Sequence, residues 1–177
     1  RASKYIPEFT GHGKEAITVE QLLLHTSGLI ADNSLSDYLH GKAKAFNHIH
    51  QLKLRTRPGE RFTYSDVGFL VLGEIVEKVS GEPLDQFCRR RIFAPLGMKE
   101  TTFRPGKELA LRAAPTEKEK ETWLRGTVHD PRARAIGGVA GHAGLFSTAD
   151  DLALYARMML NQGKPLFKSA PWKLFNT

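Results

Sequence analysis

The sequence contains a single cysteine, Cys88, so it can form no internal disulfide and no cysteine-based zinc site. Cys88 lies within a helical pattern, which favours a half-buried structural thiol. No apolar run approaches the roughly 20 residues that a membrane-spanning helix needs. The chain begins with Arg1 and has no signal-peptide pattern, which suggests a processed or truncated product and leaves the compartment of its parent open.

The common signatures of a serine nucleophile are also missing. There is no G-x-S-x-G elbow and no K-T-G, and no serine is followed three residues later by the lysine of an S-x-x-K motif. The glycine-rich segment 137–148 lacks the features of a dinucleotide loop or a phosphate loop. Its glycines predict instead that its backbone approaches a neighbouring group closely. A different serine, such as Ser65 or Ser147, remains open as a nucleophile for weak esterase activity.

Composition predicts one ordinary globular domain. The chain has 177 residues, 41% hydrophobic and 25% charged, with no linker or internal repeat. Its net charge is +7, but the basic residues are scattered and only Arg89-Arg90-Arg91 forms a run. This distribution predicts a solvated basic face and disfavours nucleic acid as a partner.

A polar triplet, Tyr64-Ser65-Asp66, precedes the clearest helix of the sequence. We predict Asp66 as the N-cap residue and Gly81 as the left-handed C-cap. The predicted core positions recur at helical spacing and are Val67, Leu70, Val71, Ile75, Val76 and Val79. Taken alone, the triplet fits a capped helix start with a packed tyrosine.

Shorter signals predict a mostly helical α+β fold. Capping-box patterns begin helices after Thr18 and Thr148, and a third helix follows Pro83. We expect helices over 19–25, 34–54, 84–93 and 149–160, and short strands over 101–103 and 123–128. The expected core side of the last helix carries Leu152, Tyr155, Ala156, Met159 and Leu160.

The histidines offer one alternative chemistry. His129, Asp130 and His142 are suitable ligands for zinc or iron, but no third histidine has the spacing to join them. We therefore predict no metal site and a structural hydrogen bond between Asp130 and His142. His25 is predicted to be a structural histidine at a helix end, and His48 and His50 to be solvated.

Four ordered segments closely resemble the serine β-lactamase family, which includes class C β-lactamases, related esterases and low-molecular-weight penicillin-binding proteins. These segments are residues 17–29, the triplet Tyr64-Ser65-Asp66, residues 81–84 together with 92–98, and residues 144–152. In the family, S-x-x-K would lie upstream of this chain and K-T-G or H-x-G downstream. The resemblance therefore implies a single partial domain over 1–177, the helical lobe with little of the sheet.

The resemblance also implies a function: a serine hydrolase that cleaves an ester, amide or β-lactam through an acyl-enzyme. Tyr64 matches the family's catalytic tyrosine and Asp66 a substrate-binding asparagine. No cofactor is implied, and the location would be the bacterial periplasm or cell envelope. The isolated chain should be inactive or weakly active and should self-associate, because the missing sheet leaves apolar faces uncovered. The alternative is a non-catalytic binding or scaffold domain derived from that fold.

Overall fold

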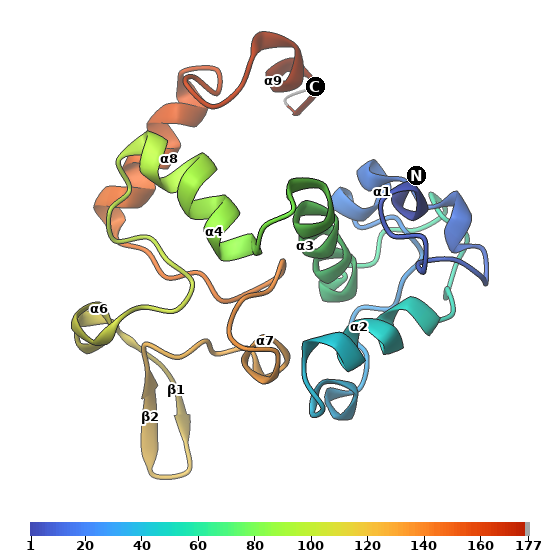
Figure 1. Ribbon diagram of the computed structural model, residues 1–177, viewed down its shortest axis with the longest axis horizontal. Helices are drawn as coiled ribbons and strands as arrows, with labels where there is room; N and C mark the ends of the chain where they lie inside the picture. Colours follow the sequence, from blue (N-terminus) through green and yellow to red (C-terminus); the bar gives the residue numbers. More distant parts are fainter. Residues whose placement is uncertain (176–177) are drawn as a thin grey trace. The chain divides into compact units, whose positions relative to one another are not determined.

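The computed structural model describes residues 1–175, which form two compact units (Figure 1). Unit 1 comprises Arg1–Leu84 and Val128–Gly144, and unit 2 comprises Asp85–Thr127 together with the chain from Leu145 onward. The single domain predicted over 1–177 remains a prediction. Within residues 1–175, none of the helices has the length and apolarity needed to cross a membrane.

Unit 1 is built from helices and short helical turns. Its α-helices are α1 (Val19–Leu23), α2 (Lys42–Gln51), α3 (Asp66–Ser80) and α7 (Pro131–Ala135), and its 3-10 turns are Ala2–Lys4, Lys14–Ala16 and Leu35–Tyr38. The predicted capping box of α1 is confirmed: Thr18 accepts from the backbone of Gln21, whose side chain accepts from the backbone of Thr18.

The central helix, α3, confirms most of its prediction. Gly81 ends it in the left-handed conformation, at φ 72°. The apolar stripe is buried at Val67, Leu70, Val71 and Ile75, whereas Val79 is 64% exposed. The N-cap prediction was wrong by one residue. Ser65 caps the helix through its hydroxyl, which accepts from the backbone of Gly68, and Asp66 is the first helical residue.

The helix predicted over 34–54 was wrong in its first half. Gly41, at φ 87°, separates the turn Leu35–Tyr38 from α2, because a left-handed residue interrupts helical hydrogen bonding. His50 was also wrongly predicted to be solvated. Its Nε2 lies 2.8 Å from an oxygen of Glu74, and its side chain is only 10% exposed. His48 is exposed as predicted.

The glycine-rich segment packs against α3 by backbone contact. A Cβ atom at Gly141 would lie 2.0 Å from the carbonyl oxygen of Phe69, and one at Gly73 would lie 3.0 Å from the Cα of Gly141. Neither position has room for a side chain. The predicted close approach of this segment is therefore confirmed, and its partner is the middle of α3.

Unit 2 contains the remaining elements. They are α4 (Leu84–Cys88), which begins at the unit boundary, a π-helical turn (Arg89–Phe93), α5 (Ala94–Leu96), α6 (Lys107–Arg112), the antiparallel pair β1 (Pro115–Glu119) and β2 (Thr122–Arg125), α8 (Ala149–Leu160) and α9 (Ser169–Phe175). The helix predicted over 84–93 is confirmed and continues to Leu96. The strand predicted over 101–103 is a single bridge between Thr102 and Phe146.

Helix α8 has the predicted bounds but not the predicted core side. Thr148 caps it by accepting from the backbone of Asp151. The predicted core residues Leu152, Tyr155 and Leu160 are 53%, 39% and 86% exposed. Periodicity identified an apolar stripe correctly, but nothing among the described residues covers these three side chains.

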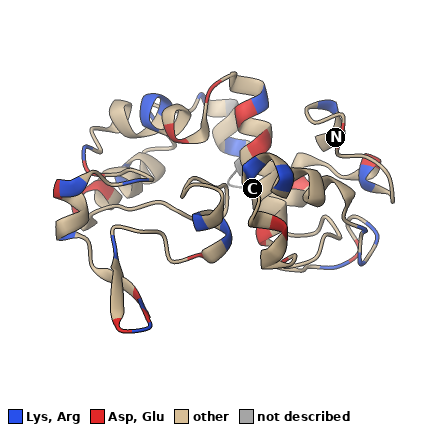
Figure 2. Ribbon diagram, turned by 60° about the horizontal axis from the view of Figure 1, so that its bottom comes forward, with Lys and Arg blue, Asp and Glu red and all other residues tan. Residues whose placement is uncertain are grey.

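Charged residues of both signs are interspersed along the helices (Figure 2). Arg89, Arg90 and Arg91, the one basic run, are all exposed, as predicted. The thiol of Cys88 is half-buried, also as predicted, and burial together with nearby Asp85 raises its pKa to about 11.

Candidate active site

The predicted triplet is fixed to the loop that follows α1. The backbone N–H of Ser65 donates to Nδ1 of His25 at 3.0 Å, and its hydroxyl donates to the carbonyl of Ile30 at 2.6 Å. The backbone N–H of Asp66 donates to the carbonyl of Ala31 at 3.0 Å. These bonds determine where the N-terminus of α3 lies. His25 is therefore a structural, hydrogen-bonded histidine, as predicted.

Tyr64 is presented to solvent above an aromatic base. Its side chain is 67% exposed, and its ring centroid lies 4.5 Å from that of His25 at an interplanar angle of 33°. The rings of Phe62 and Phe69 contact the same histidine, with centroids at 5.7 and 4.8 Å. Such ring packing orients the tyrosine and leaves its hydroxyl accessible. The packed tyrosine that the triplet alone suggests is thus packed on one face, against His25, and otherwise exposed.

Asp66 lies beside two residues from the second segment of unit 1. Ligand atoms of Asp66, Asp130 and His142 all lie within 4.8 Å of one another. Nε2 of His142 is 3.0 Å from Oδ1 of Asp130, so the predicted hydrogen bond between these two residues is confirmed. His129, the other ligand candidate from the sequence, does not belong to this group of described residues. The sequence analysis did not predict that Asp66 belongs to this group.

The two carboxylates have opposite pKa shifts. Burial raises the pKa of Asp66, and the nearby charges of Asp32 and Asp130 add to this effect, while His142 opposes it. Burial would also raise the pKa of Asp130, but hydrogen bonds from the backbone of Ala133 and from His142 outweigh it, and that pKa is lowered. Asp130 is therefore the better stabilised carboxylate.

Helix α7 brings Asp130 to this position. Asp130 is its N-cap residue and accepts from the backbone of Ala133 at 2.6 Å. Arg132 donates to the carbonyl of Asn33 through Nε and Nη2, at 3.0 and 2.8 Å. The side chain of Asn33 in turn accepts from the buried hydroxyl of Tyr38 at 2.6 Å. This network ties α7 to the loop that anchors Asp66.

Two serines, Ser65 and Ser147, were left open as nucleophiles by the sequence, and the hydroxyl of each is hydrogen-bonded within the protein. Ser65 is 1% exposed, and its hydroxyl both donates to Ile30 and accepts from Gly68. A nucleophile needs a hydroxyl that can reach a substrate, so Ser65 is a structural residue. Ser147, in unit 2, is exposed, and its hydroxyl lies 2.8 Å from that of Thr101.

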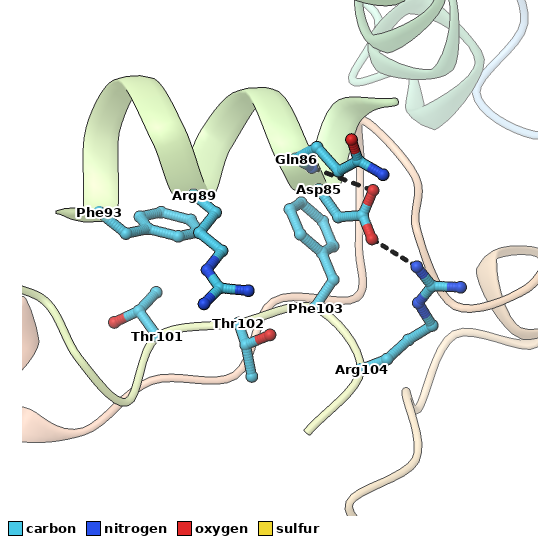
Figure 3. A pocket seen from close by; sticks show the side chains of 8 residues that line it. All are labelled: Asp85, Gln86, Arg89, Phe93, Thr101, Thr102, Phe103 and Arg104. Atoms are coloured by element: carbon cyan, nitrogen blue, oxygen red, sulfur yellow. Dashed lines mark hydrogen bonds and ion pairs between the residues drawn. The ribbon is translucent and has the colours of Figure 1, made fainter. Parts of the chain in front are cut away.

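A separate pocket of about 230 Å³ lies within unit 2 (Figure 3). Its lining includes Phe93, Phe103 and Arg89, and an ion pair between Arg104 and Asp85 closes one side. None of the predicted site residues belongs to this lining.

Comparison with known proteins decides the family of this chain. A model of the family described as Beta-lactamase matches residues 1–175. The chain belongs to the β-lactamase family. Its mostly helical architecture and small strand pair are a partial form of the family's fold, as predicted from the four sequence segments.

Curated relatives support this assignment. The chain is 35% identical over 210 residues to an Escherichia coli (strain K12) protein named as a D-alanyl-D-alanine carboxypeptidase, and the match covers 100% of the chain and 48% of the relative. It is 33% identical to a Bacillus subtilis (strain 168) protein named N-acetylmuramyl-L-alanine amidase, over 92% of the chain and 44% of the relative. The chain thus spans about half the length of these relatives.

Solved structures agree on the fold. A class C β-lactamase superimposes with a TM-score of 0.75 at 21% identity, over 91% of the chain and 43% of the lactamase. A protein described as an octameric penicillin-binding protein homologue from Pyrococcus abyssi gives 0.73 at 22% identity, over 97% of the chain and 41% of that protein. At these identities, the likeness establishes the fold alone.

Proposed function

We propose that this chain is the central part of a serine hydrolase domain in which Tyr64 transfers protons. The observation that supports this role most directly is the position of Tyr64, exposed at the N-terminus of α3 on an anchored backbone and an aromatic base. A general acid or base must combine fixed position with access to the substrate. Tyr64 also occupies the place of the family's catalytic tyrosine in the ordered motifs.

The nucleophile of this proposal lies outside the 177 residues. An S-x-x-K motif supplied upstream would provide the serine that forms the acyl-enzyme and the lysine that takes its proton. A lysine cation near Tyr64 would favour the phenolate, because an adjacent positive charge lowers the pKa of an acid. On this proposal, the isolated chain lacks the nucleophile and the base that Tyr64 would work with.

Asp66 is proposed as a substrate contact. Its carboxylate can accept an N–H from a substrate when ionised, whereas the asparagine common in the family can also donate. This difference favours a peptide that carries an N–H group or amine over a β-lactam. The names of the two relatives, a carboxypeptidase and an amidase, point the same way. We accordingly propose a cell-wall peptide as the substrate class and the cell envelope as the location.

Ester turnover separates this proposal from its alternative. Purified chain should hydrolyse p-nitrophenyl acetate and butyrate no faster than buffer does. A longer polypeptide that includes S-x-x-K should be active, and Tyr64→Phe should lower its kcat by about 10²–10⁴-fold. Tyr5→Phe, at a 38% exposed tyrosine elsewhere in unit 1, is the matched control. An unchanged kcat in Tyr64→Phe would exclude the proton-transfer role, and a fully inactive longer polypeptide would favour the scaffold function.

We also propose that the isolated chain self-associates through α8. The exposed Leu152, Tyr155 and Leu160 lie on one helix, and exposed apolar stripes favour association. Light scattering at micromolar concentration should show oligomers. The double variant Leu152→Ser/Leu160→Ser should shift them toward monomer, whereas a monomeric parent chain would refute this proposal.

A further inference from the structure

We propose that Asp66, Asp130 and His142 form a binding site for one divalent transition-metal ion. The sequence alone offered His129 as the third ligand, and the structure supplies Asp66 in its place. The site shares Asp66 with the proposed substrate contact, but it can be tested without measuring activity.

The donor set suits such an ion. Zinc and neighbouring metals bind imidazole nitrogen and carboxylate oxygen at about 2.0–2.2 Å. Donor atoms bound to one metal therefore lie about 3–4 Å apart. The three candidate atoms lie within 4.8 Å of one another, so only small side-chain shifts are needed. Three protein ligands would leave a fourth position open, as in zinc sites that also bind water or substrate.

The charges around the site favour a cation. Asp66 and Asp130 bring two carboxylates together, and Asp32 contributes a third nearby charge. Arg132 offsets part of this charge, but it is directed to the carbonyl of Asn33 and lies 3.6 Å from Asp32. Crowded carboxylates repel one another at low local dielectric, and a divalent ion would remove that cost.

The ring of His142 is already held at this group. Its side chain is only 2% exposed, and Nε2 lies 3.0 Å from Oδ1 of Asp130. Nε2 is therefore the nitrogen that would bind the ion, and Asp130 would change from hydrogen-bond partner to ligand. Nδ1, which points away from Asp130, has no hydrogen-bond partner among the described residues and takes no part in the proposed site.

The site joins three parts of unit 1. Asp66 begins α3, Asp130 caps α7, and His142 lies in the glycine-rich segment that packs on α3. An ion bound there would cross-link these segments and so stabilise the folded state, because a ligand that binds only the native form shifts the unfolding equilibrium. The ion would also fix the position of Asp66, which follows Tyr64 by two residues in the sequence.

Metal titration of the chain tests the proposal. Chain treated with EDTA and dialysed should bind one Zn²⁺ ion, measured by calorimetry and by elemental analysis, and Co²⁺ should give the visible absorption of a protein-bound ion. Asp66→Asn and Asp130→Asn should each weaken binding by about tenfold or more. Asn still serves as an N-cap, so Asp130→Asn should fold. His142→Gln should also weaken binding, with folding checked by circular dichroism.

His48→Gln is the matched control, because His48 is exposed and lies outside the group. Binding that survives in both aspartate variants, or that is lost in His48→Gln, would overturn the proposal by placing the ion elsewhere. Folded parent chain that binds no Zn²⁺ would overturn it as well.

Discussion

The two units of this chain are stabilised in different ways. The main apolar cluster lies wholly within unit 1, where Ile6, Phe9 and Ile49 are fully buried. In unit 2, a carboxylate takes a central buried position: Asp151 is 6% exposed and accepts from the backbone of Glu100 and the hydroxyl of Thr101, both at 2.8 Å. Unit 1 thus has the larger apolar core, whereas unit 2 combines a smaller one, which includes Phe93, Phe103 and Met158, with a buried and hydrogen-bonded carboxylate.

This difference bears on where a site can be built. A close-packed core resists small displacements, so residues anchored to it keep their positions. Tyr64 and Asp66 are attached to such a core through α3. Both units also leave apolar side chains exposed, for example Leu39 at 68% in unit 1 and Leu160 at 86% in unit 2. We expect substitutions to reveal the contrast, and four of them follow in order of decreasing effect.

Gly141→Ala should be the most damaging change, because packing in unit 1 leaves no room for a side chain. The new Cβ would lie 2.0 Å from the carbonyl of Phe69, so the segment would have to move away from α3. We expect a loss of about 3 kcal/mol in the free energy of unfolding. Urea denaturation followed by far-UV circular dichroism measures it.

Gly68→Ala, in the same helix, is the control for this prediction. Its Cβ would meet Ser65 and Leu22 at 3.6 and 3.7 Å, which are ordinary contacts. Alanine is the better helix former, so a gain of up to about 1 kcal/mol is expected. Equal effects of the two substitutions would contradict the close backbone packing.

Asp151→Ala should be the strongest single change in unit 2. It leaves the buried hydroxyl of Thr101 and the N–H of Glu100 without their acceptor, at an expected cost of about 2–3 kcal/mol. Trp123 and Trp172 are the only tryptophans and both belong to unit 2, so fluorescence reports its unfolding.

The neighbouring Asp150→Ala also removes an acidic residue from the first turn of α8, but at an exposed position. It should cost only about 0.5 kcal/mol, through the helix dipole. A similar loss in both variants would mean that the bonds of Asp151 contribute little to unit 2.

Ser65→Ala compares helix caps in the two units. Ser65 caps α3 and also donates to the carbonyl of Ile30, so its loss should cost about 2 kcal/mol. Thr148→Ala removes a cap of α8 whose hydroxyl accepts from the backbone of Asp151, and should cost about 1 kcal/mol. Thermal unfolding of both variants measures whether the bond from Ser65 to the carbonyl of Ile30 adds to the stability of the fold.

Thr56→Val should have the smallest effect. The hydroxyl of Thr56 is buried in unit 1 without a hydrogen-bond partner among the described residues. An isosteric apolar replacement should therefore change stability by less than about 0.5 kcal/mol, or increase it. Thr101→Val, which removes a bonded hydroxyl in unit 2, should cost about 1 kcal/mol. A larger loss for Thr56→Val would reveal a bond that the structure does not contain.

Local patterns in the sequence were sufficient for much of the fold. Helices α3 and α8 were predictable because caps, glycines and apolar spacing act within a few residues of one another. The same holds for the capping box of α1 and for the family motifs that include Tyr64 and Asp66. The roles of these two residues remain predictions that rest on the resemblance.

Tertiary structure decided what local patterns could not. The grouping of Asp66 with Asp130 and His142 joins residues more than 60 positions apart. Their proximity depends on how the glycine-rich segment packs on α3 and on how Arg132 attaches α7 to Asn33. The exposure of Leu152 and the burial of His50 against Glu74 likewise depend on which distant surface covers each side chain. The sequence by itself determined most of the helices, several of their caps and the family, because those signals are short-range. Which side chains meet, and which face water, was determined only by long-range packing.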